Sequence, residues 1–179
     1  MRWGATVVER LDPEGLTTVI DAGCGTGRVT ELLLRWASAA KVIAVDGSRL
    51  KLAAAAARLA GAISGGRVEL VHADLTKRLP VGPADAILST ATFHWIADHD
   101  ALFANLATAL RPGGQLVAQC GGAGYMGGES WAGTYFATPD ETAARLRECG
   151  FVDVDTWLES TPAPGSDYVR LNIVARRAA

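Results

Sequence analysis

Short apolar segments alternate with longer amphipathic ones between residues 17 and 120. Five short segments are rich in branched and small apolar residues and lack polar alternation, which predicts strands buried on both faces. They span 17–23, 41–46, 67–73, 84–90 and 114–120. Segments with helical spacing of apolar residues predict helices at 26–37, 48–62 and 98–110. This order of elements indicates a parallel sheet covered by helices on both faces.

The end of the chain has a different pattern. A helix is predicted at 138–149, with Thr138 as its N-cap and Pro139 at its first position. Two alternating segments follow at 151–159 and 167–177, with no helical pattern between them. Strands joined by a short connection pair antiparallel or lie apart. The sequence therefore predicts an α/β fold with a doubly wound, mostly parallel sheet and an antiparallel pair at one edge.

Length and charge exclude several classes of protein. A chain of 179 residues is long enough for a single domain with a sizeable core, and its net charge is −2. No basic run could follow a phosphate backbone, so nucleic acid is not an expected partner. The longest alanine- and leucine-rich stretch, 50–62, is broken by Lys51 and Arg58 and is shorter than the roughly 20 residues of a membrane span. We therefore expect no membrane association.

The cysteines indicate where the protein works. The three cysteines have no metal-ligand spacing, so we expect no metal site and free thiols in a reducing compartment. The first residues also lack the apolar segment of a secretory signal. The cytoplasm is the expected location, with a monomer and a homodimer both left open.

The loop after the first predicted strand, in "VIDAGCGTGRV", is the strongest candidate for a binding site. Gly23, Gly25 and Gly27 allow a ligand to approach the backbone closely. A phosphate loop would need lysine and then serine or threonine after the last glycine, and a dinucleotide loop would need glycine in place of Arg28. Asp21 would also repel a phosphate. The loop therefore favours a cationic or zwitterionic ligand.

Two further acids end the next two predicted strands. Asp46 follows the glycine loop by about twenty residues, where a carboxylate can accept hydrogen bonds from both hydroxyls of a ribose. Asp74 ends the third strand, where an acid can accept from the exocyclic amine of an adenine. Each acid alone could be a helix cap. Three acids at successive strand ends, beside a glycine loop, indicate an adenosyl ligand.

These segments resemble a known family. "VIDAGCGTG", "VIAVDGS", "VHADL" and "DAILSTATFHWIADHDALFANLATALRPGGQLVAQC" together are similar to class I S-adenosylmethionine-dependent methyltransferases, nearest to the group around trans-aconitate methyltransferase. The resemblance implies a Rossmann-like sheet of seven strands with an antiparallel final strand. It also implies a single methyltransferase domain over 1–179. The chain departs from the family near 121–133 and 160–168, where the helical cover segments of relatives are short or missing.

The resemblance also implies the residues that bind the cofactor S-adenosylmethionine and its product S-adenosylhomocysteine. The methionine part would contact Asp21, Gly23, Cys24 and Gly25, with Gly27 at the helix start and Ser89, Thr90 and Ala91 bordering it. The Asp21 carboxylate would face the amino group. The ribose and adenine would contact Asp46, Gly47, Ser48, Ala73, Asp74 and Leu75.

For the methyl acceptor, the resemblance points to His94 and Trp95, and aromatic composition adds Trp131 and Tyr135. A carboxylate acceptor is ionised at pH 7 and needs no general base, whereas a hydroxyl or amine needs one. His94 is the candidate base, and it could equally orient the substrate. We therefore expect methylation of a small molecule, with a carboxylate giving a methyl ester as one outcome.

Two alternatives remain open at this point. The chain could bind the adenosyl cofactor without turnover, as a module or a truncated domain, because its cover segments are short. It could also be a nicotinamide-dependent oxidoreductase that uses the same Asp46, although Arg28 replaces the third glycine of that fingerprint.

Overall fold

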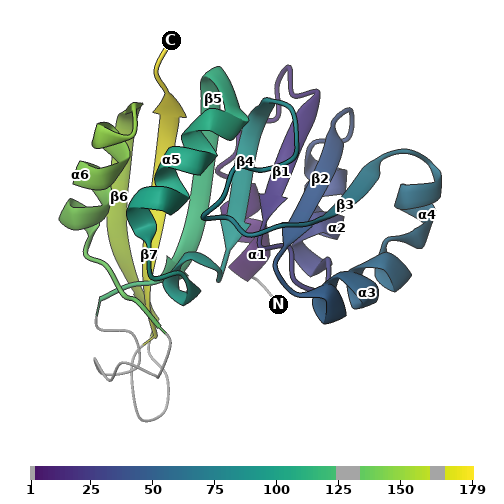
Figure 1. Ribbon diagram of the computed structural model, residues 1–179, viewed down its shortest axis with the longest axis horizontal. Helices are drawn as coiled ribbons and strands as arrows, with labels where there is room; N and C mark the ends of the chain where they lie inside the picture. Colours follow the sequence, from purple (N-terminus) through teal and green to yellow (C-terminus); the bar gives the residue numbers. More distant parts are fainter. Residues whose placement is uncertain (1–2, 124–133, 162–167) are drawn as a thin grey trace.

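A computed structural model of the chain describes residues 3–123, 134–161 and 168–179. Its described strands form one seven-stranded sheet in the order β3-β2-β1-β4-β5-β7-β6 (Figure 1). Neighbouring strands are parallel except that β7 runs antiparallel to both β5 and β6. The strands are β1 (Thr18–Ala22), β2 (Lys41–Asp46), β3 (Val68–His72), β4 (Ala84–Thr90), β5 (Leu110–Gly121), β6 (Phe151–Thr161) and β7 (Tyr168–Arg177).

Helices cover both faces of this sheet, with α5 and α6 in front and α1 and α2 behind in the view of Figure 1. Each face has its own hydrophobic core: Phe103 of α5 and Leu146 of α6 belong to one, and Val8 of α1 and Leu33 of α2 to the other. The helices are α1 (Trp3–Val8), α2 (Arg28–Trp36), α3 (Arg49–Arg58), α4 (Ala60–Ser64), α5 (His99–Ala109) and α6 (Pro139–Glu148), with a short 3₁₀ helix, η1 (Phe93–Trp95).

The predicted fold is confirmed, including the antiparallel final strand. The single helix predicted at 48–62 is wrong, because the chain leaves the helical conformation at Leu59 and forms α3 and α4 instead. Leu59 is only 3% exposed and belongs to the core behind the sheet. The predicted N-caps Ser48 and Thr138 are confirmed, and Thr138 forms a full capping box with Glu141.

The strand order also locates the candidate site. From β1 the chain builds outward to β2 and β3 on one side, and β4 then returns to the other side of β1. Ligands of doubly wound sheets bind where the order reverses, beyond the carboxyl ends of the strands. That point lies between Ala22 at the end of β1 and Thr90 at the end of β4. Within the described residues, we find no helix with the length and apolar character needed to cross a membrane.

Candidate functional site

The glycine loop after β1 is held in place by backbone hydrogen bonds. The N–H groups of Gly23 and Cys24 both donate to the Val45 carbonyl oxygen of β2, at 2.8 and 2.9 Å. Gly23 has φ +81°, and a Cβ there would lie 2.1 Å from the Thr92 hydroxyl oxygen. Gly25 has φ +57°, and a Cβ there would meet no atom within 4 Å. Gly23 therefore permits close packing inside the protein, whereas Gly25 leaves space for a ligand.

Asp46, at the end of β2, links the glycine loop to the turn that precedes α3. Its carboxylate accepts from the Gly25 N–H through Oδ2 and from the Ser48 N–H through Oδ1, both at 2.8 Å. Asp46 is 7% exposed and contributes to the wall of a cavity. Each carboxylate oxygen has a second lone pair for a ligand hydroxyl. Asp46 can therefore order the loop and bind a ligand at the same time.

Asp21 lies beneath the loop, because it is still part of β1 and its side chain faces α2. It is fully buried, and its Oδ2 accepts from the Thr30 hydroxyl at 2.6 Å. Its Oδ1 has no hydrogen-bond partner among the described residues. Burial raises the pKa of Asp21 to about 6, the Thr30 hydrogen bond opposes this rise, and the Asp46 charge adds to it. Whether Asp21 attracts a ligand amino group stays a prediction.

The first cavity has a volume of about 760 Å³ and runs along the ends of β1, β2, β3 and β4. Beyond β3, Asp74 accepts from the N–H and hydroxyl of Thr76, and these hydrogen bonds lower the pKa of its carboxyl. The predicted residues that line this cavity are Gly23, Cys24, Gly25, Asp46, Gly47, Ala73, Asp74, Leu75, Thr90, Ala91 and Trp95. The volume and the two carboxylates, Asp46 and Asp74, at or just beyond the ends of β2 and β3 fit the adenosine part of an adenosyl amino acid.

Other predicted cofactor residues lie behind the cavity wall. Gly27 is the N-cap of α2 and packs against Leu59. Ser48 caps α3, and the buried Ser89 hydroxyl donates to the Ala22 carbonyl oxygen at 2.7 Å. These three residues shape the site without lining it. Burial, with the Asp21 and Asp46 charges, raises the pKa of the Cys24 thiol, so Cys24 stays protonated and has no nucleophilic character.

A second cavity of about 370 Å³ adjoins the first. Val29, Thr90, Ala91 and Trp95 line both cavities, so the two meet at the end of β4. Ala91 has φ +53°, which is a strained conformation for a residue other than glycine, and its N–H donates to the Gln119 carbonyl oxygen at 2.8 Å. The pairing of β4 with β5 therefore holds this junction in a fixed shape.

His94 lines the second cavity and is 7% exposed. Its Nδ1 accepts from the Gly121 N–H at 3.1 Å, and its ring stacks on Phe136 with the centroids 6.0 Å apart. Burial lowers the pKa of His94 to about 4. The ring is therefore neutral at pH 7 and carries its proton on Nε2. This arrangement suits a hydrogen-bond donor that orients a ligand, and it does not suit a general base.

The other predicted acceptor residues differ in position. Trp95 is 57% exposed and stands at the mouth of both cavities. Tyr135 is 46% exposed and lines neither cavity, although its N–H donates to the His94 carbonyl oxygen at 2.7 Å. Trp131 lies outside the described residues, as do most of the segments 121–133 and 160–168.

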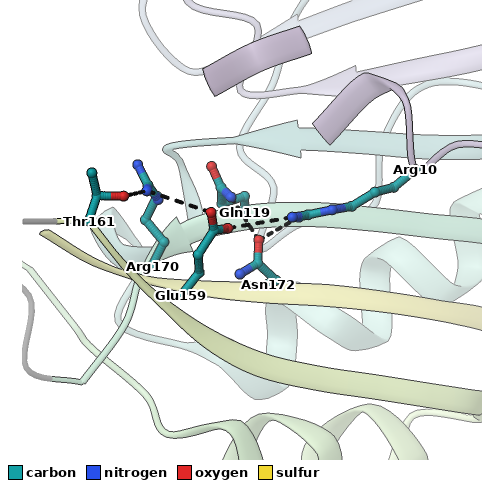
Figure 2. Close-up of polar contacts among 6 residues, drawn as sticks. All are labelled: Arg10, Gln119, Glu159, Thr161, Arg170 and Asn172. Carbon is teal, nitrogen blue, oxygen red and sulfur yellow. Dashed lines mark hydrogen bonds and ion pairs between the residues drawn. The ribbon is translucent and has the colours of Figure 1, made fainter. Parts of the chain in front are cut away.

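Sequence reasoning missed two polar residues that line the second cavity, Gln119 of β5 and Arg170 of β7. Figure 2 shows their polar contacts. Arg170 is 7% exposed, lies 3.9 Å from the Glu159 carboxylate and hydrogen-bonds Thr161. In the sequence, Arg170 and Asn172 alternate with apolar residues, a pattern typical of a solvated strand face. In the structure that face is instead buried at Arg170 and Asn172, and Arg10 lies against Asn172 there. The only signal in the sequence was Arg170 itself, a charged residue in an otherwise largely apolar strand segment.

Comparison with known proteins agrees with this geometry. A family model described as a methyltransferase domain matches residues 20–118, which run from within β1 to within β5 and include every residue that lines the first cavity. The chain belongs to the methyltransferase domain family. This methyltransferase domain is 39% identical over 101 residues to the trans-aconitate 2-methyltransferase of Acidovorax sp. strain JS42, covering 56% of the chain and 37% of the relative.

A longer match links the methyltransferase domain to the trans-aconitate 2-methyltransferase of Rhizobium leguminosarum, at 32% identity over 158 residues, 88% of the chain and 57% of the relative. The chain thus spans about half the length of such relatives or less. Among solved structures, a phosphoethanolamine N-methyltransferase of Haemonchus contortus, in complex with phosphomonomethylethanolamine and S-adenosylhomocysteine, superimposes with a TM-score of 0.85. It is 17% identical, and the match covers 99% of the chain and 53% of that structure.

Proposed function

We propose that the chain binds S-adenosylmethionine in the first cavity and methylates a small molecule held in the second, with a carboxylate as the reacting group and a methyl ester as the product. One observation carries this proposal: the two cavities share Thr90, Ala91 and Trp95, so a ligand in one can reach a ligand in the other. A reaction between two bound molecules needs this proximity above all.

The residues of the first cavity fit the cofactor. Asp46 would accept from the ribose hydroxyls, and Asp74 has carboxylate lone pairs for the adenine amine. The open space above Gly25 would admit the methionine part beside the loop. When bound, the cofactor supplies a methyl group on a positively charged sulfur. The matched family model and the solved relative with S-adenosylhomocysteine support this choice.

The second cavity supports a carboxylate acceptor. Arg170 lines this cavity and carries a permanent positive charge, and guanidinium groups bind carboxylates with two parallel hydrogen bonds. The neutral His94 would donate from Nε2 and would not remove a proton. A carboxylate needs no proton removed at pH 7, because its solution pKa is about 4. These residues fit a hydroxyl or amine acceptor less well, because such an acceptor needs a base to remove its proton.

Calorimetry and product analysis test the proposal. We expect S-adenosylmethionine and S-adenosylhomocysteine to bind, NADH not to bind, and methyl esters to form when small carboxylic acids are added. Asp155→Ala is a matched control for Asp46→Ala, because Asp155 is an exposed acid on β6. No binding of either adenosyl ligand at millimolar concentration would refute the proposal. If the protein binds the adenosyl ligands but methylates no acid, amine or phenol, the result would support the alternative of a cofactor-binding module without catalysis.

We also propose that the protein works in the cytoplasm. Cys24, Cys120 and Cys149 are all free, and burial raises the pKa of Cys120 to about 12. Free thiols persist in a reducing compartment. Fluorescence of a tagged chain in cells of a bacterial host would test this assignment.

A further inference from the structure

Figure 2 shows a row of three hydrogen-bonded polar side chains, one of which lines the second cavity. Arg10, just after α1, donates from Nη1 to the Oδ1 of Asn172 on β7. Gln119 on β5 donates from Nε2 to the same Oδ1, at 2.7 Å. Asn172 is fully buried and Gln119 is 8% exposed. Only Gln119, of the three, lines the cavity.

The chemistry of these groups fixes the orientation of both amides. A guanidinium has donors and no acceptor, so Asn172 must present its oxygen to Arg10. Gln119 must then turn its NH₂ toward that oxygen, since the opposite orientation would bring two acceptors together. Figure 2 shows the Gln119 side-chain oxygen directed away from Asn172. The row therefore gives the cavity wall a hydrogen-bond acceptor, Oε1 of Gln119.

Arg10 is itself held in place. Its guanidinium lies 3.5 Å from the Glu159 carboxylate and 4.9 Å from the centre of the Trp157 ring, both on β6. Glu159 also contacts Arg170, the donor on the same cavity wall, at 3.9 Å. One connected network thus orients an acceptor on Gln119 and a cationic donor on Arg170.

We infer that Gln119 is a specificity-determining residue whose Oε1 accepts a hydrogen bond from a hydroxyl of the methyl acceptor, beside the carboxylate group bound by Arg170. Arg10 is a positioning residue that acts through Asn172. The substrate class is therefore small hydroxy acids. This inference rests on the proposed function, and it adds one requirement, a hydroxyl group on the acceptor that hydrogen-bonds Gln119.

Binding of matched acids to the protein saturated with S-adenosylhomocysteine tests the inference. The probes are two pairs that differ by one hydroxyl, malate with succinate and 3-hydroxybutanoate with butanoate, and the readout is the ratio of dissociation constants from calorimetry. We expect at least one pair to show about a tenfold preference for the hydroxy acid, the effect of one buried hydrogen bond. Gln119→Met should reduce that ratio to about one, with unchanged affinity for S-adenosylhomocysteine. Gln115→Met, the same change earlier in β5, should keep the ratio, because Gln115 does not line the second cavity; its two hydrogen bonds to the Asp12 backbone make it a strict control, since they hold the segment that follows Arg10.

Two Arg10 variants distinguish an effect on the orientation of Asn172 from an effect on the stability of the protein. Arg10→Met removes the donor that orients Asn172, so the hydroxyl preference should fall at least threefold even at temperatures where the variant is fully folded. Arg10→Lys keeps a donor and should retain most of the preference. If the acids bind but neither pair shows a preference, or if Gln119→Met keeps one, the inference is overturned while the proposed function stands. If none of the four acids binds to a protein that does bind S-adenosylhomocysteine, the inference is overturned, whereas the proposed function is overturned only if the adenosyl ligands themselves fail to bind.

Discussion

The two cavities are built in different ways. Residues at and just beyond the ends of β1, β2, β3 and β4 form most of the first cavity, and Asp46 and Val45 hold its loop. The second cavity brings together Gly4 near the start of the chain, His94 after β4 and Arg170 near the end. The first is therefore suited to a constant ligand recognised by local motifs. Substitution of single side chains on these separate elements could change which ligand the second cavity binds, without altering the cofactor site.

The largest expected effect concerns Asp46→Ala. It removes the acceptor for the Gly25 and Ser48 N–H groups as well as for a ribose. We expect affinity for S-adenosylhomocysteine to fall by about 100-fold or more, because each hydrogen bond to a charged group contributes about 1.5–3 kcal/mol. Isothermal titration calorimetry measures this, with Asp155→Ala as the control. A change below fivefold would contradict the role given to Asp46.

Arg170→Met tests whether the second cavity is independent of the first. Methionine keeps much of the length and removes the charge, so the KM for a carboxylic acid should rise by about 10- to 50-fold. Affinity for S-adenosylhomocysteine should stay within about twofold. Steady-state kinetics and calorimetry together give both numbers. If the affinities for the carboxylic acid and for S-adenosylhomocysteine fell equally, Arg170 would stabilise the fold and would not bind the acceptor.

Asp21→Asn tests the buried acid beneath the first cavity through pH. The unfolded carboxyl releases its proton near pH 4 and the folded one near pH 6, so the folded state binds more protons between these values. Wild-type stability should therefore fall as pH rises from 4 to 6, by about 2 kcal/mol, and the variant should lack this fall. Urea unfolding at pH 4 and pH 7.5 measures the difference between the two proteins. A difference independent of pH would contradict the raised pKa.

The same variant tests the predicted role of Asp21 toward the ligand amino group. If the ionised carboxylate attracts that group, wild-type affinity for S-adenosylhomocysteine should increase as pH rises through 6. Asp21→Asn should show no such increase over the same range.

The smallest expected effect concerns the junction of the two cavities. Ala91→Gly removes the strain of a positive φ, so the free energy of unfolding should rise by about 1 kcal/mol and Tm by about 2–4 °C. Ligand affinities should change by less than about twofold, because the Ala91 N–H keeps its bond to Gln119. Thermal unfolding with and without S-adenosylhomocysteine measures both. A loss of stability would contradict the strain at Ala91.

The same contrast explains how much the sequence could predict. Asp46, Gly25 and Asp74 lie at strand ends in segments whose hydrophobic pattern is clear, so parallel strands bring them to one edge. The fold follows from the same pattern. The break at Leu59 could not be located from the pattern, because the alanine-rich residues before it have high helix propensity and Gly61 lowers that propensity only beyond the break.

The second cavity could not be predicted for a different reason. Gln119 and Arg170 meet only because β7 inserts between β5 and β6, and the alternation of Arg170, Leu171 and Asn172 reads as a half-exposed strand. The amide orientations depend on Arg10, more than a hundred residues away from Gln119 in the chain. Local patterns carry no information on such contacts.

A crystal structure with S-adenosylhomocysteine bound tests the central claim most directly, which is that two joined cavities hold the donor and the acceptor. The account predicts the ribose on Asp46, the adenine near Asp74 and the sulfur at Thr90 and Ala91, facing the cavity that Arg170 and Gln119 line. A sulfur atom that faces away from that cavity, or a ligand bound elsewhere on the protein, would contradict it.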